Sequence, residues 1–290
     1  MRVDQGASGN VLVGCSGELL RIDAEGSPLH QPVVPFPSNV SGGAVIGECW
    51  VGTWVDQEFR EARMAALRID GDWIDGGGRE QLREASDAKL LMPASSIWSR
   101  RLDAEPMALT QTSDGVVFAT LNRGVYLIDE KATELWRSPY PEWPGLAKYH
   151  HSDSIVSCTE HEGRIGLWSR SGSVTLLDGQ DGSFVSSHAI GLMSPLAGAE
   201  FSEDGGWLLM QENGDVGILD DLLLSPSIVR TPGPVFDANY SEGRWRWTGW
   251  RHDGTILDGR CEIEIRRDIG IGLVGDNVVT NDGRWDEFRA

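Results

Sequence analysis

The densest group of ionisable side chains in the sequence contains two histidines and a carboxylate. His150, His151 and Asp153 lie within four positions, and Glu160 and His161 follow a short apolar segment. Imidazoles and carboxylates are common metal ligands and acid–base groups. The apolar segment is typical of a strand, which rises about 3.3 Å per residue, so the two groups lie too far apart to share one metal ion. His150, His151 and Asp153 alone could form a partial metal site, but neighbouring side chains on a strand point to opposite sides. We therefore expect polar loop residues here.

A second unusual group is a tryptophan-rich run. Trp245 and Trp247 share one face of a predicted strand, and Trp250 could join them through a bulge at Gly249. Such a group could be an aromatic platform for a sugar or a peptide. The alternative is packing between neighbouring sheets, where large aromatic side chains fill space. We favour packing and keep the platform as an alternative.

A third group is an arginine-rich segment at about 56–101, in a chain whose net charge is −19. Binding residues often lie in loops on a rigid scaffold, and a local basic patch on an acidic protein is a candidate contact surface. The alternative is a solvated loop. The residues of this segment that we select as candidates for binding a partner are Arg79, Arg83, Trp98, Arg100 and Arg101.

A repeated unit positions these groups. Each copy begins at Gly or Asp-Gly, continues as an apolar strand, turns at polar residues with Gly, and ends after a second apolar strand near Asp, which is typical of a β-hairpin. Equivalent turns are predicted at 122–124, 212–214 and 252–254. Clear copies span 9–23, 115–129, 163–178, 206–220 and 243–258, and weaker copies begin at 43 and 275.

The spacing of the copies predicts the architecture. Most starts lie 32 to 48 residues apart, close to the roughly 40–45 residues of a four-stranded propeller blade. One gap of 72 residues fits an insertion at about 56–101, with 96–102 as the outer strand of the second blade. The sequence thus predicts an all-β fold: a single β-propeller domain over 1–290 with about seven four-stranded blades. We expect the N-terminal segment to complete the last blade and close the ring.

Composition limits the partners. The net charge of −19 disfavours nucleic acid and anionic membranes as partners.

No apolar run approaches the roughly 18–20 residues that span a bilayer, and the start lacks the apolar core of a signal peptide. The four cysteines are far apart and form no CxxC motif. We therefore expect a cytoplasmic protein with reduced thiols. Only three lysines occur, which fits either a high-salt cytoplasm or a GC-rich genome.

Two repeat families resemble parts of the chain. Segment 115–136 resembles a quinoprotein-type (PQQ-like) repeat, with Asp129 and Trp136 near the positions of its Asp and of the Trp that docks between blades. Segments 199–205 and 235–243 are similar to the first strand of a WD40 blade, although the closing Trp-Asp pair is missing. The quinone-dependent relatives hold their cofactor with adjacent cysteines and calcium. Adjacent cysteines do not occur here, so we expect no cofactor.

Three functions remain open. The first is a non-catalytic scaffold that presents loops to a protein partner. The second is a lactonase-like hydrolase or lyase with a metal in the central channel, and the third is binding of a sugar or peptide by the tryptophan-rich blade. No nucleophile elbow, phosphate-binding loop or HExxH motif is present. The sequence therefore favours the interaction module over an enzyme and leaves the oligomeric state open.

Overall fold

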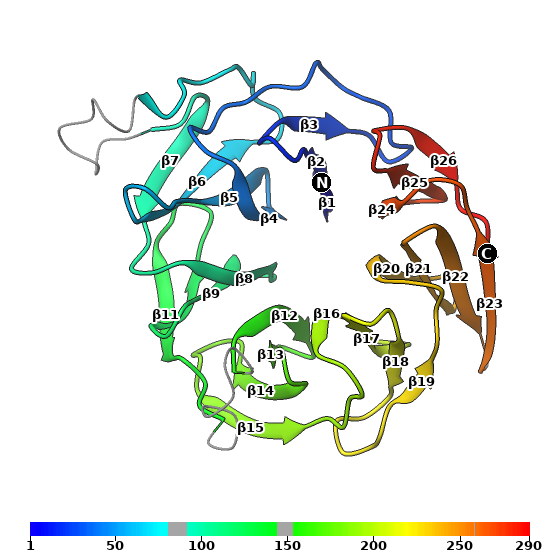
Figure 1. Cartoon of the computed structure of the whole chain (residues 1–290). Helices are drawn as coiled ribbons and strands as arrows, with labels where there is room; N and C mark the ends of the chain where they lie inside the picture. Colours follow the sequence, from blue (N-terminus) through cyan, green and yellow to red (C-terminus); the bar gives the residue numbers. More distant parts are fainter. Residues whose placement is uncertain (81–91, 144–152, 258) are drawn as a thin grey trace. The chain divides into compact units, whose positions relative to one another are not determined.

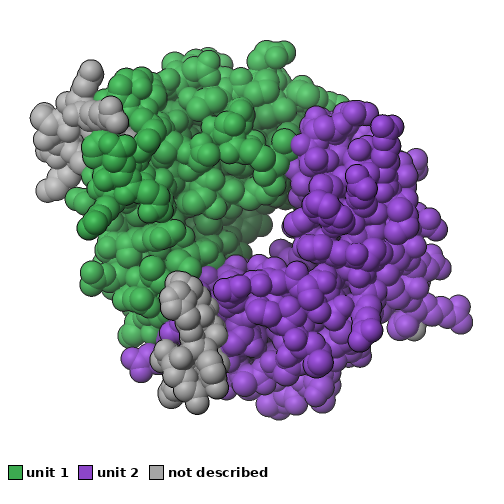
Figure 2. Space-filling view, in the orientation of Figure 1, with its two compact units in different colours: residues 1–140 green, residues 141–290 purple. Residues whose placement is uncertain are grey.

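The computed structural model describes residues 1–80, 92–143, 153–257 and 259–290. The chain forms β-strands in these ranges, and the strands pair in antiparallel order within seven sheets (Figure 1). Two compact units divide the chain, residues 1–140 and 141–290 (Figure 2). The predicted all-β propeller with about seven blades is confirmed, although two of the blades have three strands in place of four.

Unit 1 holds three of the sheets, each made of strands that follow one another in the chain. The first sheet contains β1 (Arg2–Gly6), β2 (Gly9–Val13) and β3 (Leu19–Ile22). The second contains β4 (Val40–Ile46), β5 (Cys49–Asp56), β6 (Glu61–Arg68) and β7 (Ser96–Arg101). The third contains β8 (Pro106–Gln111), β9 (Val116–Thr120), β10 (Gly124–Ile128) and β11 (Glu134–Pro139).

Unit 2 holds four sheets of the same design. The first contains β12 (Ile155–His161), β13 (Arg164–Ser169), β14 (Ser173–Asp178) and β15 (Phe184–Ala189). The second contains β16 (Leu196–Ser202), β17 (Gly206–Gln211), β18 (Val216–Leu219) and β19 (Ser227–Val229). The third sheet has β20 (Val235–Ser241), β21 (Arg244–Gly249), β22 (His252–Leu257) and β23 (Arg260–Ile265). The last has β24 (Gly270–Val274), β25 (Asn277–Thr280) and β26 (Trp285–Glu287).

The middle strands are apolar on both faces because neighbouring sheets cover them. Every residue of β9 and β10 is buried. One core cluster joins Val51 and Met64 of the second sheet to Phe118 of the third. Another joins Trp168 of β13 to Leu209 of β17. A sheet that cannot bury both faces alone is thus stabilised by the next sheet of its unit.

Most predicted hairpins are confirmed, and one turn is wrong. β9 pairs with β10 and β17 with β18 around the turns predicted at 122–124 and 212–214, and Asn122 has the positive φ of 54° that its turn requires. The turn predicted at 252–254 instead lies inside β22. The chain reverses just before it, and Arg251 has a φ of 59°.

Gly254 is needed for packing and not for a turn. It lies opposite Trp247 in the β21–β22 register. A Cβ atom at Gly254 would come within 2.3 Å of the Trp247 ring. The glycine therefore leaves the space that the fully buried indole occupies.

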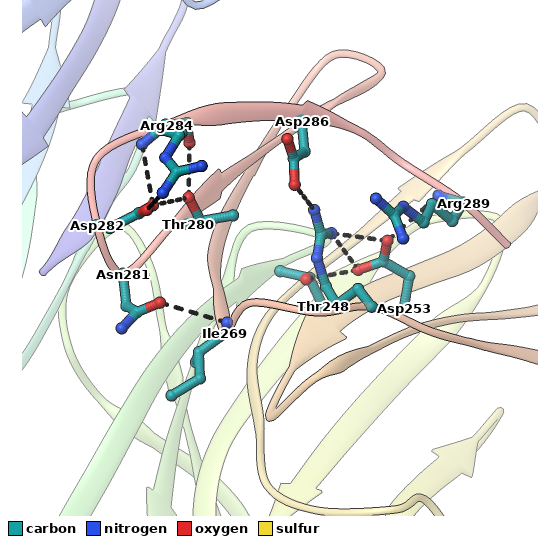
Figure 3. Close-up of polar contacts among 10 residues, drawn as sticks. Thr248, Asp253, Ile269, Thr280, Asn281, Asp282, Arg284, Asp286 and Arg289 are labelled. Carbon is teal, nitrogen blue, oxygen red and sulfur yellow. Dashed lines mark hydrogen bonds and ion pairs between the residues drawn. The ribbon is translucent and has the colours of Figure 1, made fainter.

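A buried ion pair connects the last two sheets of unit 2. The Arg266 guanidinium donates to both carboxylate oxygens of Asp253 at 2.7 Å, and neither side chain is exposed. It also donates to Asp286 of β26 at 3.2 Å (Figure 3). Asp253 accepts two further hydrogen bonds, from the Thr248 hydroxyl and from the backbone N–H of Arg289. The network therefore ties β22 to β26 and to the C-terminal residues.

The connection between β6 and β7 contains the break in the repeat. Strand β7 pairs with β6, so the prediction of an outer strand at 96–102 is confirmed. Both strands fall within the predicted insertion at 56–101, and the long connection itself spans residues 69–95. No helix in the described ranges has the length and apolar character to cross a membrane.

The N-terminal segment does not complete the last sheet. Strand β1 pairs with β2, and the last sheet has the order β24-β25-β26, so the predicted closure is not confirmed. The segment instead supports the first two sheets of unit 1. Asp4 of β1 is buried and accepts a 2.8 Å hydrogen bond from the indole Nε1 of Trp50 in β5.

Deleting residues 1–6 should therefore lower the melting temperature sharply. The deletion removes β1 and leaves the fully buried Trp50 without the acceptor of its N–H group, which carries a desolvation cost. Differential scanning calorimetry measures the change. Deletion of the partly exposed Met1 alone is the control. Equal melting temperatures for the two deletions would contradict the role of β1.

Candidate functional site

The best-defined candidate site is a pocket of about 510 Å³ in unit 2. It lies between the sheets β12–β15 and β16–β19, where the turns after β12 and β16 meet the connection after β18. Its volume is within the range of ordinary ligand pockets. Because turns and connections form its rim, the rigid sheets hold the pocket while its edge lies in exposed loops.

Aromatic rings form one wall of the pocket. The ring centroids of His161 and Trp207 are 4.8 Å apart, those of Phe201 and Trp207 4.9 Å, and those of His161 and Phe201 5.0 Å. His161 and Trp207 are each 6% exposed. Strands β12, β16 and β17 supply these rings, so regular strand geometry fixes the wall. An electron-rich aromatic wall of this kind attracts cations.

Five exposed carboxylates surround this aromatic wall. None of these five carboxylates takes part in the ion pairs found between described residues. Among the described lining residues, Arg164 is the one arginine and no lysine is present. The rim is therefore strongly negative and disfavours anionic ligands. The five carboxylates are Glu162, Glu203, Asp204, Asp220 and Asp221.

Local turn chemistry places the carboxylates. Glu162 and Gly163 make the tight turn after β12 with φ of 49° and 70°. After β18, an oxygen of Asp221 accepts the backbone N–H of Leu223 at 2.8 Å, the pattern of an Asx turn. The same connection leaves the Leu223 side chain 78% exposed beside the acidic rim. Leu223 therefore adds exposed apolar surface beside the carboxylates of the rim.

Two buried polar atoms behind this rim are without partners. The Nδ1 atom of His161 and the Nε1 atom of Trp207 have no hydrogen-bond partner among the described residues. Burial lowers the pKa of His161 below its ordinary value of 6.5, and the nearby Glu162 only partly opposes this shift. The imidazole is therefore neutral at pH 7. Water or a ligand in the pocket can supply the hydrogen-bond partners that such buried atoms need.

The buried histidines predict that the protein loses stability as the pH falls. Burial lowers the pKa of both His161 and His252 below 6.5, so the unfolded chain binds protons at these residues at a higher pH than the folded chain. The contribution of the two neutral histidines to the free energy of unfolding is therefore fully present above about pH 6.5 and is lost progressively below it. We expect a lower urea midpoint at about pH 5.5 than at about pH 7.5. The drop should be smaller in His161→Phe, and an unchanged drop would contradict the assignment.

The tryptophan-rich run is part of the core. Trp245 is 3% exposed and Trp247 is not exposed, and both belong to one cluster with Leu208 and Met210 of the preceding sheet. Their burial removes them from the predicted binding platform, because no ligand can reach the ring faces. Trp250 is 49% exposed and lies in the β21–β22 turn.

Two of the described arginine-rich candidates lie beside carboxylates. Arg79 pairs with Asp56 and Glu58, and Arg101 lies 3.9 Å from Glu61. The Trp98 indole donates to the Glu130 carbonyl, and Arg100 donates to the Ala132 carbonyl. Trp98 and Arg100 therefore hold β7 against the turn after β10. Arg83 lies outside the described residues.

The predicted metal ligands are only partly described. His150 and His151 lie outside the described residues, and Asp153 precedes β12. Within the described ranges, no three His, Cys, Asp or Glu side chains are grouped closely enough to hold a metal ion. His161, the other histidine of that sequence group, lines the acidic pocket instead.

Sequence reasoning missed the acidic rim. Two adjacent acidic pairs, Glu203-Asp204 and Asp220-Asp221, follow the first and the third strand of the same blade. Connections after alternate strands of an antiparallel sheet emerge at the same edge. Counting acidic pairs at equivalent positions of the repeat could have brought these residues together.

Comparison with known proteins supports the fold. No protein-family model and no curated protein matches the sequence. The solved structures that resemble the chain include the computationally designed protein Ika8, with a TM-score of 0.62, 12% identity, and coverage of 100% of this chain and 95% of that one. BamB from Moraxella catarrhalis has a TM-score of 0.56, 11% identity and coverage of 99% and 83%. The WD40 domain of Neurospora crassa Pan2 has a TM-score of 0.58, 10% identity and coverage of 83% and 72%.

These similarities place the chain among β-propellers. Both repeat types that the sequence resembles, the WD40 and PQQ-like types, are represented among these structures. At 10–12% identity the comparison establishes the fold and not the activity. A functional assignment must therefore come from the site.

Proposed function

We propose that the chain is a non-catalytic interaction module that binds a protein partner at the acidic pocket of unit 2. The single observation that carries the proposal is the combination of five exposed carboxylates with an aromatic wall at the edge of two rigid sheets. The resemblance to a WD40 domain supports an interaction role in general terms. The proposal requires no cofactor and no nucleic acid.

Exposed apolar side chains near the rim favour a protein over a small ligand. Leu223 is 78% exposed and Leu224 58% exposed, both in the connection after β18. Phe184 is 68% exposed at the start of β15, the strand that supplies two lining residues of the pocket, Ser186 and His188. Apolar residues beside a charged recess form the mixed surface that protein partners cover.

The cysteines support a reducing compartment. Cys15 and Cys261 are exposed free thiols, and Cys49 and Cys158 are buried and unpaired. Burial raises the pKa of Cys158 to about 12, so this thiol is inert. Free exposed thiols persist where glutathione and thioredoxin keep them reduced, and this supports our proposal of a cytoplasmic location.

The test compares two double variants with the wild-type chain. The pocket variant is Glu203→Gln/Asp204→Asn, and the control variant is Glu262→Gln/Glu264→Gln on β23, which removes two exposed carboxylates outside the pocket. Proteins captured from an extract of the source cells are identified by mass spectrometry, and each purified candidate is titrated by calorimetry.

The proposal predicts one stoichiometric partner that binds the wild-type chain and the control variant equally. The pocket variant should bind it at least about tenfold more weakly, since each lost charge-assisted contact costs roughly 1.5–3 kcal/mol. A purified partner with equal affinity for the pocket variant would overturn the proposal. So would the recovery of no stoichiometric partner.

A further inference from the structure

From the chemistry of the acidic pocket we infer that it receives an arginine side chain of an extended peptide segment. The inference rests on the proposed function and names the chemistry of the partner. It goes beyond general attraction to positive charge, because the pocket combines three features that one residue type satisfies together.

The first feature is the arrangement of rings and carboxylates. A guanidinium is planar and can stack on an aromatic ring while its N–H groups donate to carboxylates in its own plane. The wall of His161, Phe201 and Trp207 offers rings, and the rim offers carboxylates on three separate connections. A lysine ammonium is a strongly hydrated point charge and uses such a wall less well.

The second feature is the pair of unpaired buried atoms. Trp207 Nε1 is a donor that needs an acceptor, and the neutral His161 leaves one ring nitrogen as an acceptor. A peptide that carries arginine brings both kinds of group, because the guanidinium donates and the main-chain carbonyl accepts. Both histidine and tryptophan are 94% buried and line the pocket.

The third feature is size. A pocket of about 510 Å³ exceeds the volume of one arginine side chain and has room for the neighbouring peptide groups. Leu223 of the lining is exposed, and Phe184 is exposed two residues before the lining residue Ser186, so a peptide can continue from the pocket over apolar surface. The volume therefore fits an arginine that is part of a protein segment.

The experiment uses the full chain and three short capped peptides with glycine on both sides of a central residue. The central residue is arginine, lysine or citrulline, the last being a neutral analogue of arginine with the same shape. Binding is followed by two-dimensional NMR of the indole N–H groups, with Trp207→Phe to assign the Trp207 signal. Calorimetry gives the affinities for the wild-type chain, the pocket variant and the control variant.

The inference predicts that the arginine peptide shifts the Trp207 signal and binds at least about tenfold more tightly than the citrulline peptide. The lysine peptide should bind more weakly than the arginine peptide. The pocket variant should lose most of the arginine affinity, and the control variant should keep it. Equal affinity for the arginine and citrulline peptides, or an equal loss in both variants, would overturn the inference.

The two proposals can fail separately. If a partner depends on Glu203 and Asp204 but the arginine peptide leaves the Trp207 NMR signal unchanged, the proposed function stands and the arginine site is refuted. If the arginine peptide binds in the pocket but the partner binds the pocket variant as tightly as the wild-type chain, the proposed function alone is refuted.

Discussion

Replacing Arg266 with alanine should lower the free energy of unfolding by about 3–5 kcal/mol, as expected when one partner of a buried ion pair is removed. Asp253 has no exposed side-chain surface, and its main charge partner is the Arg266 guanidinium at 2.7 Å. The substitution also removes the contact to Asp286 that joins β22 to β26 (Figure 3). Urea unfolding followed by tryptophan fluorescence measures the change.

A double-mutant cycle separates the ion pair from simple loss of packing. Asp253→Ala should also be severe, because among the described residues it leaves the buried guanidinium with Asp286 as its one carboxylate partner, and Asp286 is partly exposed. The combined variant Arg266→Ala/Asp253→Ala should cost clearly less than the sum of the two single changes, since it leaves neither charge buried alone. Additive losses would show that the two side chains act independently.

Trp247→Ala should lower the free energy of unfolding by about 3–5 kcal/mol, the usual cost of a large cavity in a core. The indole is fully buried among residues of two neighbouring sheets and packs directly on Gly254. Alanine there leaves a space that the rigid strands cannot fill. Urea unfolding at neutral pH measures this change.

Trp250→Ala is the matched control for this substitution. Trp250 comes from the same run of sequence but is 49% exposed, so its replacement should cost about 1 kcal/mol or less. The comparison tests the conclusion that the run contributes packing and not a ligand platform. Equal destabilisation by the two substitutions would contradict the positions that the structure assigns to the rings.

The period of the repeat was the part of the fold that the sequence could predict. Hairpins such as β9–β10 follow from two apolar runs around a turn at 122–124, which is a local property of the chain. Gly254 shows the limit of that reasoning. A glycine between polar residues was interpreted as a turn, but its role is to admit the Trp247 ring from the neighbouring strand. That contact depends on register, which the local pattern does not contain.

The candidate site was harder to predict for a related reason. His161, Trp207 and Asp221 come from three separate strands or connections, and only the stacking of two sheets brings them into one pocket. Conversely, Trp98 and Arg100 were candidates for binding a partner, yet both donate to carbonyl groups of the next sheet. Contacts between sheets decide which side chains remain available, and they are not local in sequence.

Site-specific photo-crosslinking tests the central claim most directly. A photoreactive amino acid replaces Leu223, which is 78% exposed and lines the acidic pocket, or Ile265, which is 64% exposed at the end of β23. After irradiation in the source cells, mass spectrometry identifies the crosslinked protein and the attachment point. The account predicts one partner crosslinked from position 223, through a segment that contains arginine, and none from position 265. A partner captured only from position 265 would contradict it.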